Sequence, residues 1–159
     1  MLITPKEQAV AVLNNKQLPI RKRELALHYL TGHPTLEGIK AMVDALRDSD
    51  FALRWLAATA LAQLGPLALP EVLRALTNPK SNTVRLREGV VHILHYSSNL
   101  AHESVFTQQH MEPQVFIEPG KLVSVRKLMT ALKGQLADIN SMKEAGKLLL
   151  EFENHPKNK

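Results

Sequence analysis

The chain contains no cysteine among its 159 residues. This absence excludes disulfides, thiolate nucleophiles and metal sites held by thiolates, such as zinc–cysteine sites and iron–sulfur clusters. Aromatic residues are also scarce, at 4% of the chain. Because β-strands favour aromatic and β-branched residues, this scarcity argues against a sheet protein. A chain without cysteine is compatible with a reducing compartment, and we expect a cytoplasmic protein.

Long hydrophobic runs are missing too. The longest stretch without a charged residue, from Trp55 to Pro70, is interrupted by Gly65-Pro66. A membrane-spanning helix needs about 20 uninterrupted apolar residues, so we expect no membrane span. The first residues, MLITPKEQAVAVLNN, lack the basic and apolar regions of a signal peptide. Instead, Thr4-Pro5-Lys6-Glu7 forms a capping box with proline at the first helical position, which predicts a first helix.

The residues that are abundant favour helices. Hydrophobic residues make up 45% of the chain and charged residues 22%, as in an ordinary globular protein. The hydrophobic residues are mostly leucine and alanine, the strongest helix formers. The composition therefore predicts an all-α protein, and the length suits a single domain over residues 1–159.

Residues 53–79 show a helical hairpin. A first apolar stripe with helical spacing consists of Leu53, Leu56, Ala57, Ala60, Leu61 and Leu64. Gly65 is placed to end this helix and Pro66 to open the next one. The second stripe consists of Leu69, Val72, Leu73 and Leu76. The unit is thus a pair of helices about 30 residues long.

The hairpin recurs along the chain. In a register of 33, Leu53-Arg54 has a later counterpart in Leu86-Arg87 and an earlier one in Ile20-Arg21. A register of 31 would instead match Val84-Arg85, but it would place Glu88, His92 and His95 in the core, so we prefer 33. The second helices repeat less strictly, with a shift of 30 to 33 between their stripes, the earlier of which is Leu36, Ile39, Val43 and Leu46.

This pattern resembles the HEAT-like repeat. The residues that carry the resemblance are Asp50, Leu53-Arg54, Ala57-Ala58, Ala60-Leu61 and Gly65. The resemblance implies an armadillo-like α-solenoid, a right-handed α-α superhelix of about four helical hairpins. It also implies a ladder of Asp and Arg side chains between neighbouring units. Asp48 or Asp50 would pair with Arg54, whereas the next unit offers Asn78 in place of the aspartate.

The regular repeats cover about residues 18–97, and residues 98–120 break the rhythm as an insertion. Within it we expect a short helix from Asn99 to about Gln109, then an extended segment in which Val115-Phe116-Ile117 covers a groove or forms an oligomer contact. A modified repeat unit is the alternative. Residues 121–153 are expected to form two capping helices, the first ending at about Leu136 and the second opening at a capping box, Ser141-Met142-Lys143-Glu144.

No motif indicates an enzyme. The sequence has no glycine-rich phosphate loop and no GxSxG, so we expect no catalytic residue and no cofactor. Glu88, His92 and His95 share a helical face and are weak candidates for metal ligands, but the HExxH arrangement is absent and a polar surface explains them better. Further ligands from the insertion would be His102, Glu103, His110 and Glu112.

We therefore expect a scaffold that binds a protein partner through side chains of successive units. The candidate contacts are Lys40, Asp44, Arg47, Glu71 and Arg74. The alternative is a nucleic-acid-binding protein, since the net charge is +5. Its phosphate contacts would be Arg21, Lys22, Arg23, Arg54, Arg85 and Arg87.

Two families built on HEAT-like units bear on this choice. Alkylpurine DNA glycosylases grip DNA with several tryptophans, whereas this chain has only Trp55, which we expect to pack against the next unit. Phycobilisome lyases share the repeat alone, so they add little. The sequence leaves the identity of the partner and the oligomeric state open.

Overall fold

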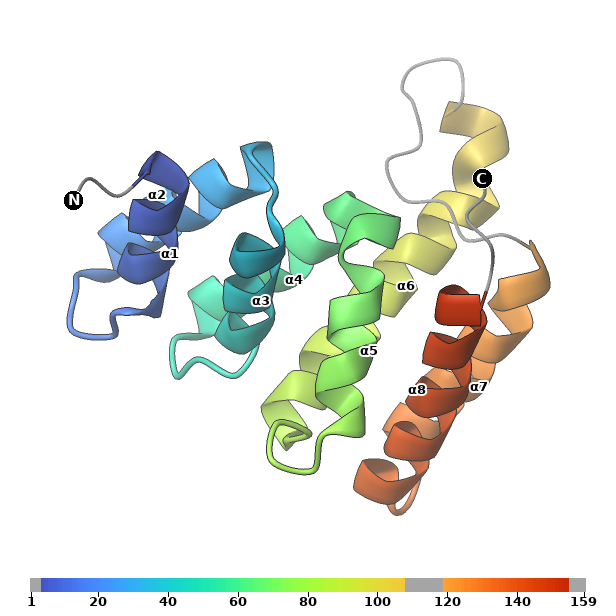
Figure 1. Ribbon diagram of the computed structural model, residues 1–159. Helices are drawn as coiled ribbons and strands as arrows, with labels where there is room; N and C mark the ends of the chain where they lie inside the picture. Colours follow the sequence, from blue (N-terminus) through green and yellow to red (C-terminus); the bar gives the residue numbers. More distant parts are fainter. Residues whose placement is uncertain (1–3, 108–118, 155–159) are drawn as a thin grey trace.

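The computed structural model describes residues 4–107 and 119–154, and all regular structure in these ranges is helical (Figure 1). The all-α prediction is therefore confirmed for the described residues. The elements are α1 (Pro5–Asn14), α2 (Ile20–Gly32), α3 (Leu36–Ala45), α4 (Phe51–Leu64), the 3₁₀ turn η1 (Gly65–Leu67), α5 (Leu69–Thr77), α6 (Val84–Thr107), α7 (Pro119–Lys133) and α8 (Ala137–Asn154).

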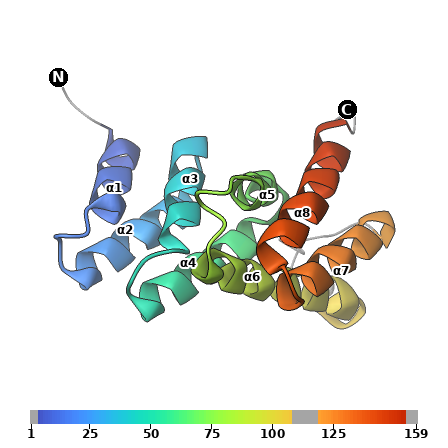
Figure 2. The same cartoon turned by 90° about the horizontal axis from the view of Figure 1, so that it is seen from below.

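The helices form two layers. One layer consists of α1, α3, α5 and α8, and the other consists of α2, α4, α6 and α7 (Figure 2). Each helix packs against its neighbours in the same layer and against at least one helix of the other layer. From α1 to α6 the chain alternates between the layers, so residues one hairpin apart lie side by side on the same face.

The predicted apolar stripes line the interface between the layers. Leu53, Ala57, Ala60 and Leu61 of α4 are buried, and the positions of α6 that match them in a register of 33 are also buried: Leu86, Val90, Ile93 and Leu94. Val84 is 60% exposed, which rules out the register of 31. The stripe of α5 is buried along its whole length. Ile39 and Val43 of α3 and Leu46 directly after it are buried, but Leu36 is exposed. A shift of 30 residues therefore aligns the buried stripe of this segment with that of α5.

The predicted register of α2 is wrong by one residue. Ile20 lies at the surface, whereas Arg23, Ala26 and Leu27 are buried at the positions that Ala57, Ala60 and Leu61 occupy in α4. The register between α2 and α4 is therefore 34. Pro19 is the N-cap of α2 and takes the place of Leu53. Because proline disfavours helical conformation in the residue before it, α2 begins there and lacks the first core residue of α4.

The predicted start of a separate helix at Asn99 is also wrong. Helix α6 continues to Thr107, so no separate helix begins at Asn99. The physical reason is that residues 84–107 contain no proline, and nothing in them stops a helix. Pro119 then opens α7. Val115-Phe116-Ile117, together with the rest of residues 108–118, lies outside the described residues.

The two predicted capping boxes have different outcomes. The Thr4 box is confirmed, because the Thr4 hydroxyl accepts from the Glu7 N–H and the Glu7 carboxylate accepts from the Thr4 N–H. The Ser141 box is wrong. Leu136 adopts a left-handed conformation with φ 52° and is exposed, and α8 begins directly after it at Ala137. Ser141 therefore lies inside the helix and is buried.

Within the described ranges, no single helix is long and apolar enough to cross a membrane. Helix α4 with η1 reaches that length and composition only together with α5, as a pair bent by 110°.

Candidate functional site

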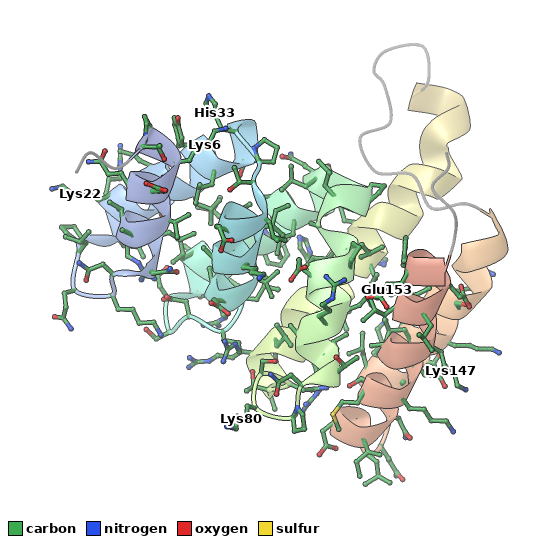
Figure 3. The ribbon with its side chains drawn as sticks, viewed as in Figure 1. Lys6, Lys22, His33, Lys80, Lys147 and Glu153 are labelled. Atoms are coloured by element: carbon green, nitrogen blue, oxygen red, sulfur yellow. The ribbon has the colours of Figure 1, made fainter. Side chains whose placement is uncertain are left out.

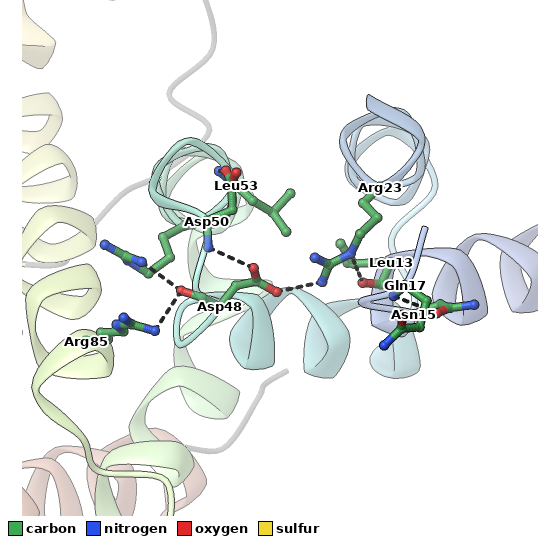
Figure 4. A network of polar contacts seen from close by, with 9 residues as sticks. Leu13, Asn15, Gln17, Arg23, Asp48, Asp50, Leu53 and Arg85 are labelled. Carbon is green, nitrogen blue, oxygen red and sulfur yellow. Dashed lines mark hydrogen bonds and ion pairs between the residues drawn. The ribbon is translucent and has the colours of Figure 1, made fainter. Parts of the chain in front are cut away.

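A buried ion pair links α2 to the turn between α3 and α4. Arg23 Nη2 donates to Asp48 Oδ2 over 2.6 Å, and Arg23 Nε donates to the Leu13 carbonyl oxygen over 2.9 Å (Figure 4). Only 5% of Arg23 and 2% of Asp48 are exposed. The other carboxylate oxygen of Asp48 accepts from the Asp50 N–H. The aspartate of this turn thus holds two neighbouring hairpins together.

This contact corrects part of the predicted ladder. Arg54 binds Asp48 through the backbone, since its Nη1 donates to the Asp48 carbonyl oxygen over 2.7 Å, while the carboxylate pairs with Arg23. Burial acts to raise the pKa of Asp48, but the hydrogen bonds from Arg23 and the Asp50 N–H, with the charges of Arg23 and Lys16, outweigh it. The net result is a lowered pKa, so Asp48 stays ionised.

The next turn repeats the arrangement with an amide. Asn82 takes the place of Asp48 in a register of 34 and is also buried. Arg87 Nη1 donates to the Asn82 side-chain and backbone oxygens over 2.6 and 3.1 Å, and the Asn82 amide donates to Leu76 O and Ser141 Oγ. Asn82 rather than the predicted Asn78 is therefore the ladder residue. The Asn78 side chain accepts from the Lys80 N–H in a local turn.

The five predicted partner contacts come together in one groove. It lies between α3 and α5, has a volume of about 330 Å³, and is lined by Lys40, Val43, Asp44, Arg47, Glu71, Arg74, Ala75, Asn78 and Ser81. We call it the α3–α5 groove. The convergence follows from the fold, because α3 and α5 are neighbours in one layer and present equivalent faces on the same side.

The charges in the α3–α5 groove are mostly paired. Asp44 pairs with Arg47 over 3.1 Å, and Arg74 pairs with Glu71. Arg74 also binds Glu153 of α8 over 3.0 Å, on the side of α8 that faces α5 (Figure 3). The hydrogen bond to Glu153, more than the charge of Glu71, raises the pKa of Arg74. Lys40 is exposed and makes no ion pair with the described side chains, those of residues 4–96 and 124–153.

The predicted phosphate contacts are separated by the structure. Arg23 is buried and its charge is neutralised by Asp48, which corrects the predicted contact with a phosphate of nucleic acid. Arg87 is half-buried and bound to Asn82. Arg54 and Arg85 meet, since both donate to the Asp48 carbonyl oxygen (Figure 4). Arg21 and Lys22 are exposed in the first turn of α2.

A row of aromatic side chains crosses from α4 to α6. The ring centroids of Trp55 and His92 are 3.9 Å apart, and those of Phe51 and Trp55 are 6.2 Å apart. Trp55 therefore packs against the next unit, as predicted. Yet 51% of Trp55 and 67% of Phe51 remain exposed. Arg54 covers the Phe51 ring at 5.5 Å. We call these residues, with Arg85, the α4–α6 aromatic surface.

The histidine candidates do not gather as metal ligands. No group of three or more His, Asp or Glu side chains suited to a metal ion occurs in the part of the chain that the structure describes. His92 instead stacks on Trp55 and lies 3.4 Å from the Thr59 hydroxyl. Burial, followed by the nearby charge of His95, lowers the pKa of His92. The side chains of His102, Glu103, His110 and Glu112 lie outside the described part.

No family profile matches the chain, and no curated protein or solved structure is significantly similar to it. The function is therefore inferred from the side chains themselves. Sequence reasoning missed the pairing of Arg23 with Asp48. The signal that reveals it is the register of 34, which places a charged residue where the other first helices carry Ala57 and Val90.

Proposed function

We propose that the chain is a HEAT-like α-solenoid, a right-handed superhelix of about four helical hairpins, and that its α3–α5 groove binds a protein partner. Three observations support the solenoid: the two helical layers, the core positions that repeat in registers of 33 and 34, and the repeated polar turns at Asp48 and Asn82. The observation that carries the function is the convergence of five exposed or partly exposed charged side chains from two successive units on one groove.

The charge pattern favours a polypeptide over a nucleic acid in this groove. Asp44, Glu71 and the adjacent Glu153 would repel phosphates, whereas a protein segment carries charges of both signs. The apolar side chains of Val43 and Ala75 give the groove a small hydrophobic contact area beside these charges. The ion pairs of Arg47 and Arg74 hold the groove's side chains in place before binding, which reduces the entropy cost of association.

The role we propose is recognition on a preformed surface, without chemistry. The test is affinity capture from native cells with nuclease present. Lys40→Glu reverses a charge in the groove without breaking an ion pair among the described residues, so the fold should persist. We expect the recovery of the partner to fall about tenfold, because a like-charge contact in an interface costs at least about 1.4 kcal/mol.

The matched control is Lys143→Glu, which makes the same charge change on α8 at a position that does not line the groove. It should retain the partner. Equal recovery by the Lys40 and Lys143 variants would refute the groove as the binding surface.

A second candidate function is supported by the α4–α6 aromatic surface. Exposed rings stack on nucleobases and arginines neutralise phosphates, so Phe51 and Trp55 beside Arg54 and Arg85 suit single-stranded nucleic acid. This function predicts steep salt dependence, which Arg54→Glu combined with Arg85→Glu would abolish. No measurable affinity of the wild type for oligonucleotides, or equal affinity in the double variant, would refute this second function.

A further inference from the structure

Arg23 is a costly residue at its position. The equivalent residues of α4 and α6 are Ala57 and Val90, and all three are buried. Burying an arginine and its aspartate partner removes two charges from water, and such a pair is often no more stabilising than apolar residues of similar size. Positions where a repeat departs from its own pattern at a cost are often tied to binding.

Arg23 lines a polar cavity between α1 and α3. The cavity has a volume of about 340 Å³ and its walls are Leu13, Asn14, Lys16, Arg23, Ala41, Asp44, Ala45, Arg47 and Asp48. We call it the α1–α3 pocket. Asp44 and Arg47 also line the α3–α5 groove, so the two cavities adjoin across α3. A segment that lies in the groove can therefore reach the pocket with one side chain.

One positively charged side chain of the α1–α3 pocket has no negatively charged partner among the described residues. Asp48 is neutralised by Arg23, and Asp44 is neutralised by Arg47. Lys16 is exposed and forms no ion pair in the part of the chain that is described, yet its charge reaches Asp48. Arg23 uses Nε and Nη2 for its two hydrogen bonds, while Nη1 donates to no atom of the described residues. The pocket thus offers unmatched donors and a single unmatched positive charge.

We propose that the α1–α3 pocket receives the carboxylate of an aspartate or glutamate side chain from the polypeptide that docks in the α3–α5 groove. This inference rests on the proposed function. One negative charge matches the one unmatched cation. A phosphate group carries up to two negative charges and would face Asp44 and Asp48, so a carboxylate fits this wall better.

A random peptide library displayed on phage tests this inference while the partner is still unidentified. Peptides selected by the wild-type protein should carry an acidic residue at one fixed position. Against Lys16→Glu, we expect the enrichment of that acidic residue to fall at least fivefold, because the variant makes the pocket negative. Lys22→Glu, an equal charge change on exposed α2 surface away from both cavities, should keep the wild-type preference (Figure 3).

The outcomes separate the two proposals. One outcome is that the selected peptides bind and compete with each other but share no acidic residue at a fixed position. Another is that selection against Lys16→Glu still enriches that acidic residue. Either outcome would overturn the carboxylate site without refuting the groove as a docking surface. A selection that enriches no peptide above empty phage would overturn the groove as a docking surface, and the carboxylate site with it.

Discussion

The pair of Arg23 and Asp48 is the most deeply buried ion pair among the side chains that the structure describes. Each residue neutralises the charge of the other where little of either side chain is exposed, so removing one partner leaves an uncompensated buried charge. One unit later the corresponding residues are Ala57 and Asn82, which are uncharged, and Val90 takes the position of Arg23 in α6. The repeat itself therefore supplies the substitutions that test the pair.

Arg23→Val alone and Asp48→Asn alone should each lower the free energy of unfolding by about 3 kcal/mol. The double variant, which removes both charges and so leaves neither buried without a partner, should cost less than either single change. Urea unfolding followed by circular dichroism measures all three. Asp44→Asn, which breaks the exposed pair with Arg47, is the control and should change stability by less than about 1 kcal/mol. Additive costs in the double variant would contradict the account.

His92 makes stability depend on pH. Its pKa is lowered in the folded protein, chiefly by burial against α4, so the unfolded chain binds a proton more readily. Stability due to this group is therefore present above the ordinary histidine pKa of about 6.5 and is lost as the pH falls below it. His92→Gln should lose less stability between about pH 7.5 and 5 than the wild type.

Thermal unfolding at several pH values measures this difference, and His28→Gln on the exposed face of α2 is the matched control. Parallel pH curves for the wild type and His92→Gln would show that this ring does not carry the dependence. Asp48 affects stability in a separate pH range. Because its pKa is lowered in the folded protein, the stability that it contributes is lost only as the pH falls below the ordinary aspartate pKa of about 4.

At the scale of helices, the sequence predicted which segments are helical better than where they end. Apolar spacing identifies α4 and α5, because burial of one face is what stabilises a short helix. Ends depend on single residues whose effect is decided by tertiary contacts. Ser141 opens a sequence typical of a capping box, but the chain turns earlier, at Leu136, and the Ser141 hydroxyl instead accepts a hydrogen bond from the Asn82 side-chain amide.

The start of α4 is held by a side-chain cap. Asp50 Oδ1 accepts from the Leu53 N–H over 2.9 Å and occupies the N-cap position. Asp50→Ala should lower the free energy of unfolding by about 1 kcal/mol, since the freed N–H loses its partner and the helix dipole its counter-charge. Ser49→Ala, at the exposed neighbouring residue, should change it by less than about 0.5 kcal/mol. Chemical denaturation measures the free energy of unfolding of both variants. Equal losses would show that the Asp50 side chain does not stabilise the start of α4.

At the scale of the whole molecule, the periodicity of the sequence is the basis on which the side chains of the α3–α5 groove are predicted to share one surface. Residues one repeat apart share a face, so the charges of Lys40, Asp44 and Glu71 were expected on one surface, and they line one cavity. The α1–α3 pocket was not predictable in this way. It depends on Arg23 reaching Asp48, which is distant in sequence, from a hairpin whose register is shifted by one position at Pro19.

Amide hydrogen exchange of the protein, alone and with the polypeptide captured in the presence of nuclease, tests the central claim most directly. Binding in the α3–α5 groove predicts slower exchange in Leu36–Ala45 and Leu69–Thr77. Protection confined to Phe51–Leu64 and the first turns of α6, on the α4–α6 aromatic surface, would contradict it and place the binding face on the opposite layer.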